Sequence, residues 1–177
     1  MFNAKIKDIW RPEGSEIMNE AYLLTGGNTG NRHGYLQQAV ELIGQSCGKV
    51  VKKSSLYETA PWGNTDQPAF FNQALLLFTP MTSTLLMAEL LAIEEKMGRR
   101  RLEKYGPRII DIDILLFNDE VIHSSFLIIP HPELKNRRFA LTALAEIAPR
   151  LQHPVLHKTV RQLLKECPDD LAVKKIN

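Results

Sequence analysis

The chain has 177 residues, of which 44% are hydrophobic and 24% are charged, and its formal net charge is +2. This length and composition predict one globular domain that can bury a sizeable core. A net charge so close to zero excludes a protein that binds polyanions over its whole surface, so any basic patch must be local.

The cysteines and the apolar runs indicate the cellular compartment of the protein. Cys47 and Cys167 have no metal-ligand spacing, and two thiols form no disulfide framework. Free thiols in a reducing compartment are the simplest interpretation. No apolar run approaches the roughly 18 residues of a membrane span, and no secretory h-region is recognisable. We therefore expect a cytoplasmic protein that has no membrane partner.

The first residues form a segment of their own. Residues 1–19 precede the first strand-like run, and Ile6, Ile9 and Trp10 could form one apolar helical turn within them. We interpret this segment as an N-terminal extension that packs on the domain or on a neighbouring chain. Residues 20–177 are expected to form the single domain.

The first half of the chain alternates strand-like and helix-like segments. Residues 21–27 are typical of a buried strand closed by glycines, and a helix with Asn31 as its N-cap follows. Strand-like segments at 49–59 and 69–78 are separated by a polar loop. A second amphipathic helix, which Thr82 can cap, comes next.

The second half begins with a basic loop at 99–108, which leads directly into another strand. After a turn at 118–120, residues 121–130 are predicted to return as a strand. Two short helices are expected at 140–148 and 159–168. The order β-α-β-β-α-β favours an α+β fold, a ferredoxin-like sandwich in which helices pack on one face of an antiparallel sheet.

The glycine cluster TGGNTGN, residues 25–31, has two possible interpretations. It is not G-x-G-x-x-G, and no acidic residue follows at the place where a dinucleotide ribose would need one. A tight turn from strand to helix accounts for the glycines better.

Two aspartates lie inside the apolar run YGPRIIDIDILLF, residues 105–117. Residues i and i+2 share one face of a strand, so Asp111 and Asp113 point one way while Ile110 and Ile112 point into the core. Two ionised carboxylates this close repel each other, and a divalent cation would relieve that repulsion. The pattern predicts half of a Mg²⁺ site, with substrate phosphates as further ligands. A solvent-facing strand that carries two charges is the alternative.

Cationic and polar side chains flank this strand on both sides along the chain. They are Arg99, Arg100, Arg101, Lys104, Arg108, His131, Lys135, Asn136, Arg137 and Arg138. A run of arginines is often a solvated face, but carboxylates for metal and arginines for phosphate are together the two halves of a phosphoryl-transfer site. Walker A and protein-kinase motifs are absent from the sequence, which excludes those two classes.

Two other functions remain open at this point. One is a different phosphoryl-transfer or phosphate-hydrolysing enzyme that uses the same aspartate pair. The other is an RNA-binding module built on a small sheet with a basic loop. The second is disfavoured because two aspartates on the sheet face repel phosphate when no metal is bound.

Several segments, in the same order along the chain, resemble the 6-hydroxymethyl-7,8-dihydropterin pyrophosphokinase family. They are LLTGGN (23–28), SSLYETAPWGNTDQPAFFNQAL (54–75), IEEKMGRRR (93–101), KYGPRIIDIDILLF (104–117) and IPHPELKNRRFAL (129–141). The resemblance spans about residues 21–165. It implies transfer of a pyrophosphoryl group from ATP to the hydroxymethyl group of a reduced pterin in folate biosynthesis, giving AMP and the pterin diphosphate.

The resemblance also implies roles for individual residues. Asp111 and Asp113 would hold two Mg²⁺ ions together with ATP, and Arg99 and Arg108 would act most directly in the transfer. The matched pterin-binding positions are Thr59, Ala60, Trp62, Phe70, Asn72, Asp111 and Phe139. The matched ATP-binding positions are Glu94, Arg101, Tyr105, Arg108, Ile114, His131 and Arg137. Neither nucleic acid nor an obligatory protein partner is expected.

Strand alternation sets one condition on this assignment. Arg108 is in phase with Ile110, not with Asp111, so its side chain can reach the site only if the strand begins after it. Phe70 and Asn72 share a face of their strand, as a pocket that stacks a flat ring and hydrogen-bonds its edge would require.

Overall fold

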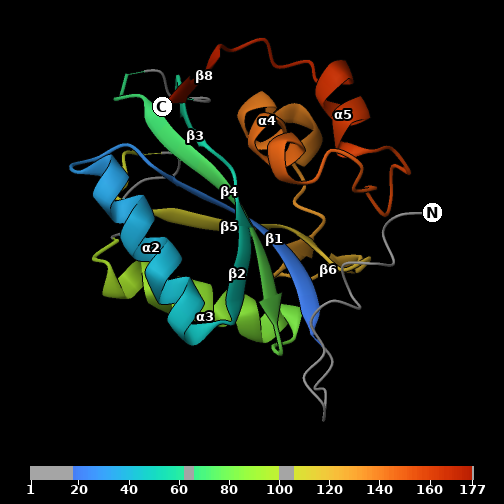
Figure 1. The fold of residues 1–177 in the computed structure, drawn as a ribbon, viewed down its shortest axis with the longest axis horizontal. Helices are drawn as coiled ribbons and strands as arrows, with labels where there is room; N and C mark the ends of the chain where they lie inside the picture. The colour runs from blue at the N-terminus through green and yellow to red at the C-terminus, as the bar shows by residue number, and fades with distance from the viewer. Residues whose placement is uncertain (1–17, 62–65, 100–105, 177) are drawn as a thin grey trace.

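The computed structural model describes residues 18–61, 66–99 and 106–176. Its centre is a six-stranded sheet in which every pairing is antiparallel (Figure 1). The strands are β1 (Asn19–Gly27), β2 (Lys49–Lys53), β3 (Leu56–Thr59), β4 (Phe70–Thr79), β5 (Asp111–Phe117) and β8 (Val173–Ile176). The predicted extension, residues 1–19, lies almost entirely outside the described residues.

Four helices among the described residues flank this sheet. They are α2 (Arg32–Ser46), α3 (Ser83–Lys96), α4 (Arg138–Ile147) and α5 (Val160–Glu166). The sheet order β5-β1-β4-β3, combined with the chain order β1-α2-β2-β3-β4-α3-β5, is the ferredoxin-like arrangement of two split βαβ units. The predicted α+β, ferredoxin-like fold is thereby confirmed.

The expectation that the helices cover one face of the sheet was wrong. Helices α2 and α3 pack on one face and α4 and α5 on the other, as Figure 1 shows. Strand alternation explains why both faces need a cover: Leu23 and Leu75 lie beneath α2 and α3, whereas Leu24 and Leu76 lie beneath α4. A strand that is apolar on both faces must be buried on both.

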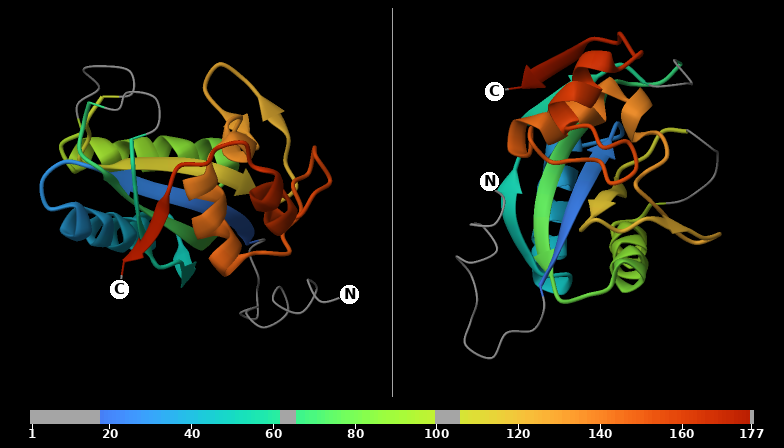
Figure 2. Two further views of the ribbon diagram at one scale, coloured as in Figure 1. Left: turned by 90° about the horizontal axis from the view of Figure 1, so that it is seen from above. Right: turned by 90° about the vertical axis from the view of Figure 1, so that its right-hand side faces the viewer.

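Two of the predicted strands differ from their expected form, and one further strand was not predicted. The segment 49–59 is interrupted at Ser54, whose hydroxyl accepts the Ala74 N–H and so replaces a regular ladder contact. The segment 121–130 forms two short strands, β6 (Ile122–His123) and β7 (Ile128–Ile129), which pair with each other outside the main sheet (Figure 2). Strand β8, which pairs with β3, was not predicted.

The helix starts follow the expected capping residues. Asn31 accepts a hydrogen bond from the Gly34 N–H, and Thr82 accepts one from the Leu85 N–H. Within the described ranges, no helix combines the length and the apolar character needed to cross a membrane.

Strand β5 keeps the predicted alternation over its first half. Ile110, Ile112 and Ile114 are buried in the core beneath α2 and α3. The register against β1 then shifts at a bulge, after which Leu115 and Leu116 both lie in the core beneath α4. The two aspartates therefore lie on the part of the strand that precedes the bulge.

A carboxylate on α4 joins this helix to two strands. Glu146 accepts hydrogen bonds from Ser55 N–H (3.0 Å), Ser55 Oγ (2.8 Å) and Tyr57 Oη (2.8 Å), and it pairs with Lys175 Nζ at 3.1 Å. Burial raises the pKa of Glu146, but these donors together outweigh it and lower the pKa to about 2. Burial, together with the contact to Glu146, raises the pKa of Tyr57 to about 12.

We expect the Glu146→Gln substitution to lower the free energy of unfolding by about 1–2 kcal/mol at neutral pH, because an amide accepts these donors less strongly than a carboxylate. The pKa of Glu146 is lower in the folded chain, so its contribution is complete above pH about 4.5 and is lost as pH falls toward about 2. Urea titrations should show a smaller difference in the free energy of unfolding between the variant and the parent at pH 3 than at pH 7. Glu95→Gln, at an exposed position on α3, is the matched control; an equal loss there would contradict the role of Glu146.

Candidate active site

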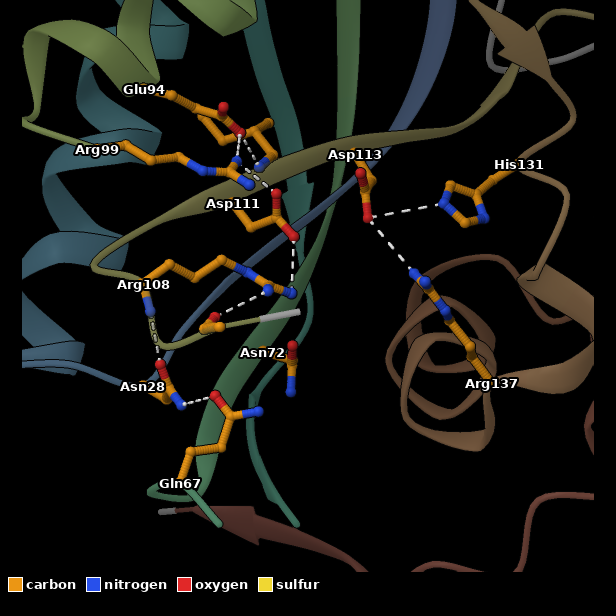
Figure 3. Close-up of polar contacts among 12 residues, drawn as sticks. Asn28, Gln67, Asn72, Glu94, Arg99, Arg108, Asp111, Asp113, His131 and Arg137 are labelled. Atoms are coloured by element: carbon orange, nitrogen blue, oxygen red, sulfur yellow. Dashed lines mark hydrogen bonds and ion pairs between the residues drawn. The ribbon is translucent and has the colours of Figure 1, made fainter. Parts of the chain in front are cut away.

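A pocket with about 550 Å³ of empty space opens where β1, β4 and β5 meet the start of α4. Nine of the predicted site residues line it: Thr59, Ala60, Phe70, Asn72, Arg108, Asp111, Asp113, Arg137 and Phe139. Leu24, Gly26 and Gln67 line it as well and were not predicted. The pocket has a charged end around the aspartates and an aromatic and amide end around Phe70 and Asn72. Figure 3 shows the two aspartates and Asn72.

The charged end is organised around Asp111. Arg99 Nη1 donates to Asp111 Oδ1 at 2.5 Å, and Arg108 Nη2 lies 3.0 Å from Asp111 Oδ2. Each carboxylate oxygen therefore has its own guanidinium (Figure 3). The two arginines that were predicted to act in the transfer reach the same aspartate from opposite sides.

Glu94 supports this arrangement from the core. Its side chain is 3% exposed, and its Oε1 accepts the Ile112 N–H at 2.6 Å and pairs with Arg99 at 2.5 Å. A buried carboxylate is stable only when such donors surround it. Glu94 lies behind Arg99, where it fixes the end of α3 to the start of β5; its predicted contact with ATP stays a prediction.

Asp113 has longer contacts with its partners than Asp111 has. Its Oδ2 lies 3.6 Å from Arg137 Nη1 and 3.8 Å from His131 Nε2. Withdrawal from water and the neighbouring charge of Asp111 raise the pKa of Asp113 to about 7. Burial and the charge of Arg137 lower the pKa of His131 to about 4, so the imidazole is neutral near pH 7. This end of the pocket favours a ligand that brings positive charge to the carboxylates.

Arg108 meets the condition set by strand alternation. Strand β5 begins at Asp111, so Arg108 lies before the regular strand and its side chain turns toward the aspartates. The backbone of β1 approaches this segment closely, since a Cβ at Gly27 would lie 2.3 Å from Ile109 O. The guanidinium also lies 5.0 Å from the Phe70 ring centroid. Its Nε is buried and has no hydrogen-bond partner among the described residues.

The aromatic and amide end has a fixed orientation. Phe70 and Asn72 are 8% and 4% exposed and share the pocket face of β4, as predicted. Asn72 Nδ2 donates to Thr59 Oγ1 at 2.9 Å, which sets the direction of the amide. A Cβ at Gly26 would lie 2.6 Å from Asn72 Oδ1, so a larger residue at the floor of the pocket would push this amide out of its position.

Asn28 is a functional candidate that sequence reasoning missed. It is 2% exposed, and its Oδ1 accepts the Arg108 N–H at 2.9 Å. Its Nδ2 donates to Gln67 Oε1 and Pro68 O, both at 3.0 Å (Figure 3). One amide thus ties the end of the basic loop to the end of the polar loop. The signal was present as the asparagine that follows the two glycines, but its partners lie far away in sequence.

Some predicted residues are not assembled in the described site. Trp62, Arg101 and Tyr105 lie outside the described residues. The side chain of Ile114 is buried in the core, so only its backbone could contact a ligand. Among the described residues, no group of three or more His, Cys, Asp or Glu side chains could hold a metal ion, which leaves the pair Asp111 and Asp113 as the candidate protein ligands.

Comparison with known families identifies the chain. The profile of the 7,8-dihydro-6-hydroxymethylpterin-pyrophosphokinase (HPPK) family matches residues 22–149. The chain belongs to the HPPK family. It is 44% identical over 135 residues to the 2-amino-4-hydroxy-6-hydroxymethyldihydropteridine pyrophosphokinase of Bacillus subtilis, covering 76% of this chain and 81% of that one. The protein of the same name from Methylorubrum extorquens is 40% identical over 148 residues, covering 83% and 92%.

Longer proteins also contain an HPPK-like part. The folic acid synthesis protein fol1 of Pneumocystis carinii is 38% identical over 156 residues, and the match covers 88% of this chain but 21% of that protein. A crystal structure of wild-type HPPK-DHPS from Plasmodium falciparum superimposes with a TM-score of 0.71 at 21% identity, covering 86% of this chain and 45% of that chain. This second likeness supports the fold.

We expect two substitutions to distinguish the hydrogen bond that Asn28 Oδ1 accepts from those that its Nδ2 donates. Asn28→Asp keeps an acceptor for the Arg108 N–H but loses the donor to Gln67 and Pro68, whereas Asn28→Ala loses both. Amide hydrogen exchange at Arg108 should therefore rise at least about tenfold in the alanine variant and less in the aspartate variant, because breaking one buried hydrogen bond costs about 1–3 kcal/mol. Equal exchange at Arg108 in both variants and the parent would contradict the contact.

Proposed function

We propose that this chain transfers the pyrophosphoryl group of ATP to the hydroxymethyl group of 6-hydroxymethyl-7,8-dihydropterin, yielding AMP and the pterin diphosphate in folate biosynthesis. One observation carries the proposal: a single pocket contains a carboxylate pair surrounded by arginines and, next to it, an aromatic ring beside a fixed amide. Membership of the HPPK family supports the same reaction.

The charged end suits a polyphosphate. Arg108 presents a buried Nε donor, and Arg99 and Arg137 add guanidinium groups within reach of the aspartates. Planar guanidinium groups bind phosphate oxygens through paired hydrogen bonds and stabilise charge that develops during transfer. Nδ1 of neutral His131 accepts the Glu133 N–H, so its Nε2–H can donate a hydrogen bond at the same end without adding charge. These residues act mainly by position and charge, as phosphoryl transfer requires.

The carboxylate pair fits magnesium, and we propose that Asp111 and Asp113 hold two Mg²⁺ ions together with ATP. Two hard carboxylate ligands share one strand face, and burial together with the charge of Asp111 raises the pKa of Asp113, so a cation at this pair would relieve both costs. Bound Mg²⁺ would polarise the transferred phosphoryl group and lower the basicity required of any proton acceptor. Arg99 and Arg108 would then be freed from Asp111 to donate to phosphate oxygens.

The opposite end suits a flat heterocycle. Phe70 offers a ring face, and Phe139, from α4, also lines the pocket. Thr59 Oγ1 accepts one of the two Asn72 Nδ2–H donors, so Asn72 keeps its Oδ1 and a second N–H for the edge of a pterin. Thr59 and Ala60 bring backbone groups to the same edge. Trp62, Arg101 and Tyr105 remain proposed ligand contacts by resemblance, as does the backbone of Ile114.

The aromatic and amide end also discriminates against the rival functions. A general phosphoryl-transfer enzyme would need the charged end but no stacking partner next to a fixed amide. An RNA-binding surface would not place two carboxylates at the centre of its basic residues. We propose a cytoplasmic location on the basis of the two free, buried cysteines.

One assay tests the reaction directly. We expect the protein, incubated with ATP, Mg²⁺ and 6-hydroxymethyl-7,8-dihydropterin, to form AMP and the pterin diphosphate in equal amounts, followed by phosphorus NMR or ion-exchange chromatography. Omission of the pterin is the control and should leave ATP intact. ADP as the main product, or no turnover with the pterin, would overturn the proposed function.

We expect Asp113→Ala to reduce turnover at least about 100-fold, because it removes half of the carboxylate pair that would hold the metal ions. The fold should be retained, since the substitution also removes a like-charge repulsion from Asp111. Asp119→Asn, in the exposed turn after β5, is the matched control and should keep parental turnover and melting temperature. Activity of Asp113→Ala within a few-fold of the parent would refute its metal role.

A further inference from the structure

Arg32, the first residue of α2, lies outside the pocket and was given no role by sequence reasoning. Its Nη1 donates to Glu58 Oε1 at 3.0 Å and to the backbone oxygen of Ala69 at 2.8 Å. Its guanidinium also lies 3.8 Å from the centroid of the Phe71 ring. These contacts reach the end of β3 and the start of β4, the two places from which residues 60–69 depart.

The contacts of Arg32 lie directly behind the pocket. Glu58 and Phe71 face each other across β3 and β4, and the next pair along the ladder is Thr59 and Phe70. Neighbouring residues of a strand point to opposite faces. Arg32 therefore holds one face of this strand pair while Thr59 and Phe70 present the other face to the pocket.

The strand pair itself is short. Three residue pairs join β3 to β4, and Thr59 with Phe70 is the last of them before the chain leaves the sheet. The ends of a strand pair separate easily when no further contact holds them. The Arg32 guanidinium donates to Glu58 in β3 and to Ala69, the residue before β4, and it stacks on the Phe71 ring of β4, so it adds such a contact at this end.

Arginine suits this position better than lysine would. The Arg32 and Glu58 side chains are 28% and 30% exposed, so water weakens their charge attraction and the geometry matters more. A planar guanidinium can stack on Phe71 and donate to Glu58 and Ala69 at once. An ammonium group has no such plane and can reproduce only part of the set.

We propose that Arg32 is a positioning residue for the pterin: it holds the two ends of the 60–69 segment together so that Thr59 and Phe70 face one ligand. The role acts through other residues, because Arg32 does not line the pocket. It rests on the proposed function, since the ligand is the pterin. It concerns pterin affinity and leaves the phosphate-binding residues unaffected.

The test compares Arg32→Met, Arg32→Lys and, as a matched control, Arg161→Met at an exposed position on α5. Pterin binding is measured by calorimetry in the presence of Mg²⁺ and a non-hydrolysable ATP analogue, and binding of the analogue is measured alone. We expect Arg32→Met to raise the pterin Kd roughly five- to tenfold, the loss expected from two hydrogen bonds at a partly exposed site. The Kd of the analogue and kcat should change less than about twofold, KM for the pterin should rise, and Arg32→Lys should restore part of the affinity.

Each other outcome counts against the inference in a distinct way. Unchanged pterin affinity in Arg32→Met, whatever its melting temperature, would reduce Arg32 to a structural contact. An equal loss of affinity for the ATP analogue would show a general disturbance of the site. A pterin Kd raised as much in Arg161→Met would show that the effect is not local. If the parent bound the analogue but no pterin, the proposed function would fail and the role of Arg32 with it.

Discussion

The buried carboxylate of Glu94 is the constraint on which the rest of the site depends. It accepts the Ile112 N–H and pairs with Arg99, so the end of α3, the start of β5 and the first residue of the basic loop are fixed relative to one another. Asp111 immediately precedes Ile112, and its carboxylate is then held by Arg99 and Arg108. A charge that is buried to this degree tolerates few alternative arrangements, because an unpaired state costs several kcal/mol.

Strand alternation places the pocket-lining side chains on one face of the sheet and the core side chains on the other. Ile110 and Ile112 are buried beneath the helices on one face of the sheet, while Asp111 and Asp113 project into the pocket on the other. Strand β4 repeats the arrangement at its start, where Phe70 and Asn72 line the pocket and Phe71 packs against the core on the opposite face. The same few residues therefore stabilise the fold and orient the reactive groups.

Local patterns were enough to predict what depends on local periodicity. The alternation of residues 110–114, the caps Asn31 and Thr82, and the grouping of the aspartates with Arg108 and Arg137 are all seen in the structure. The features that were not predicted correctly depend on contacts between residues that are distant in sequence. Strand β8 forms only because β3 offers it an edge, the helices divide between two faces because both are apolar, and the role of Asn28 rests on contacts with residues about 40 and 80 positions away.

The ion pairs around Asp111 have a consequence for the energetics of ligand binding. Because Arg99 and Arg108 already neutralise this carboxylate, the empty pocket carries its own counter-ions. A phosphate that enters must exchange one set of ion pairs for another, so its affinity reflects the difference between two large electrostatic terms. Under the proposed function, such an exchange would bind an anion weakly in the absence of a cation and strongly once a cation satisfies the carboxylates. The pocket would then favour the cation and the phosphate arriving together, with each alone held weakly.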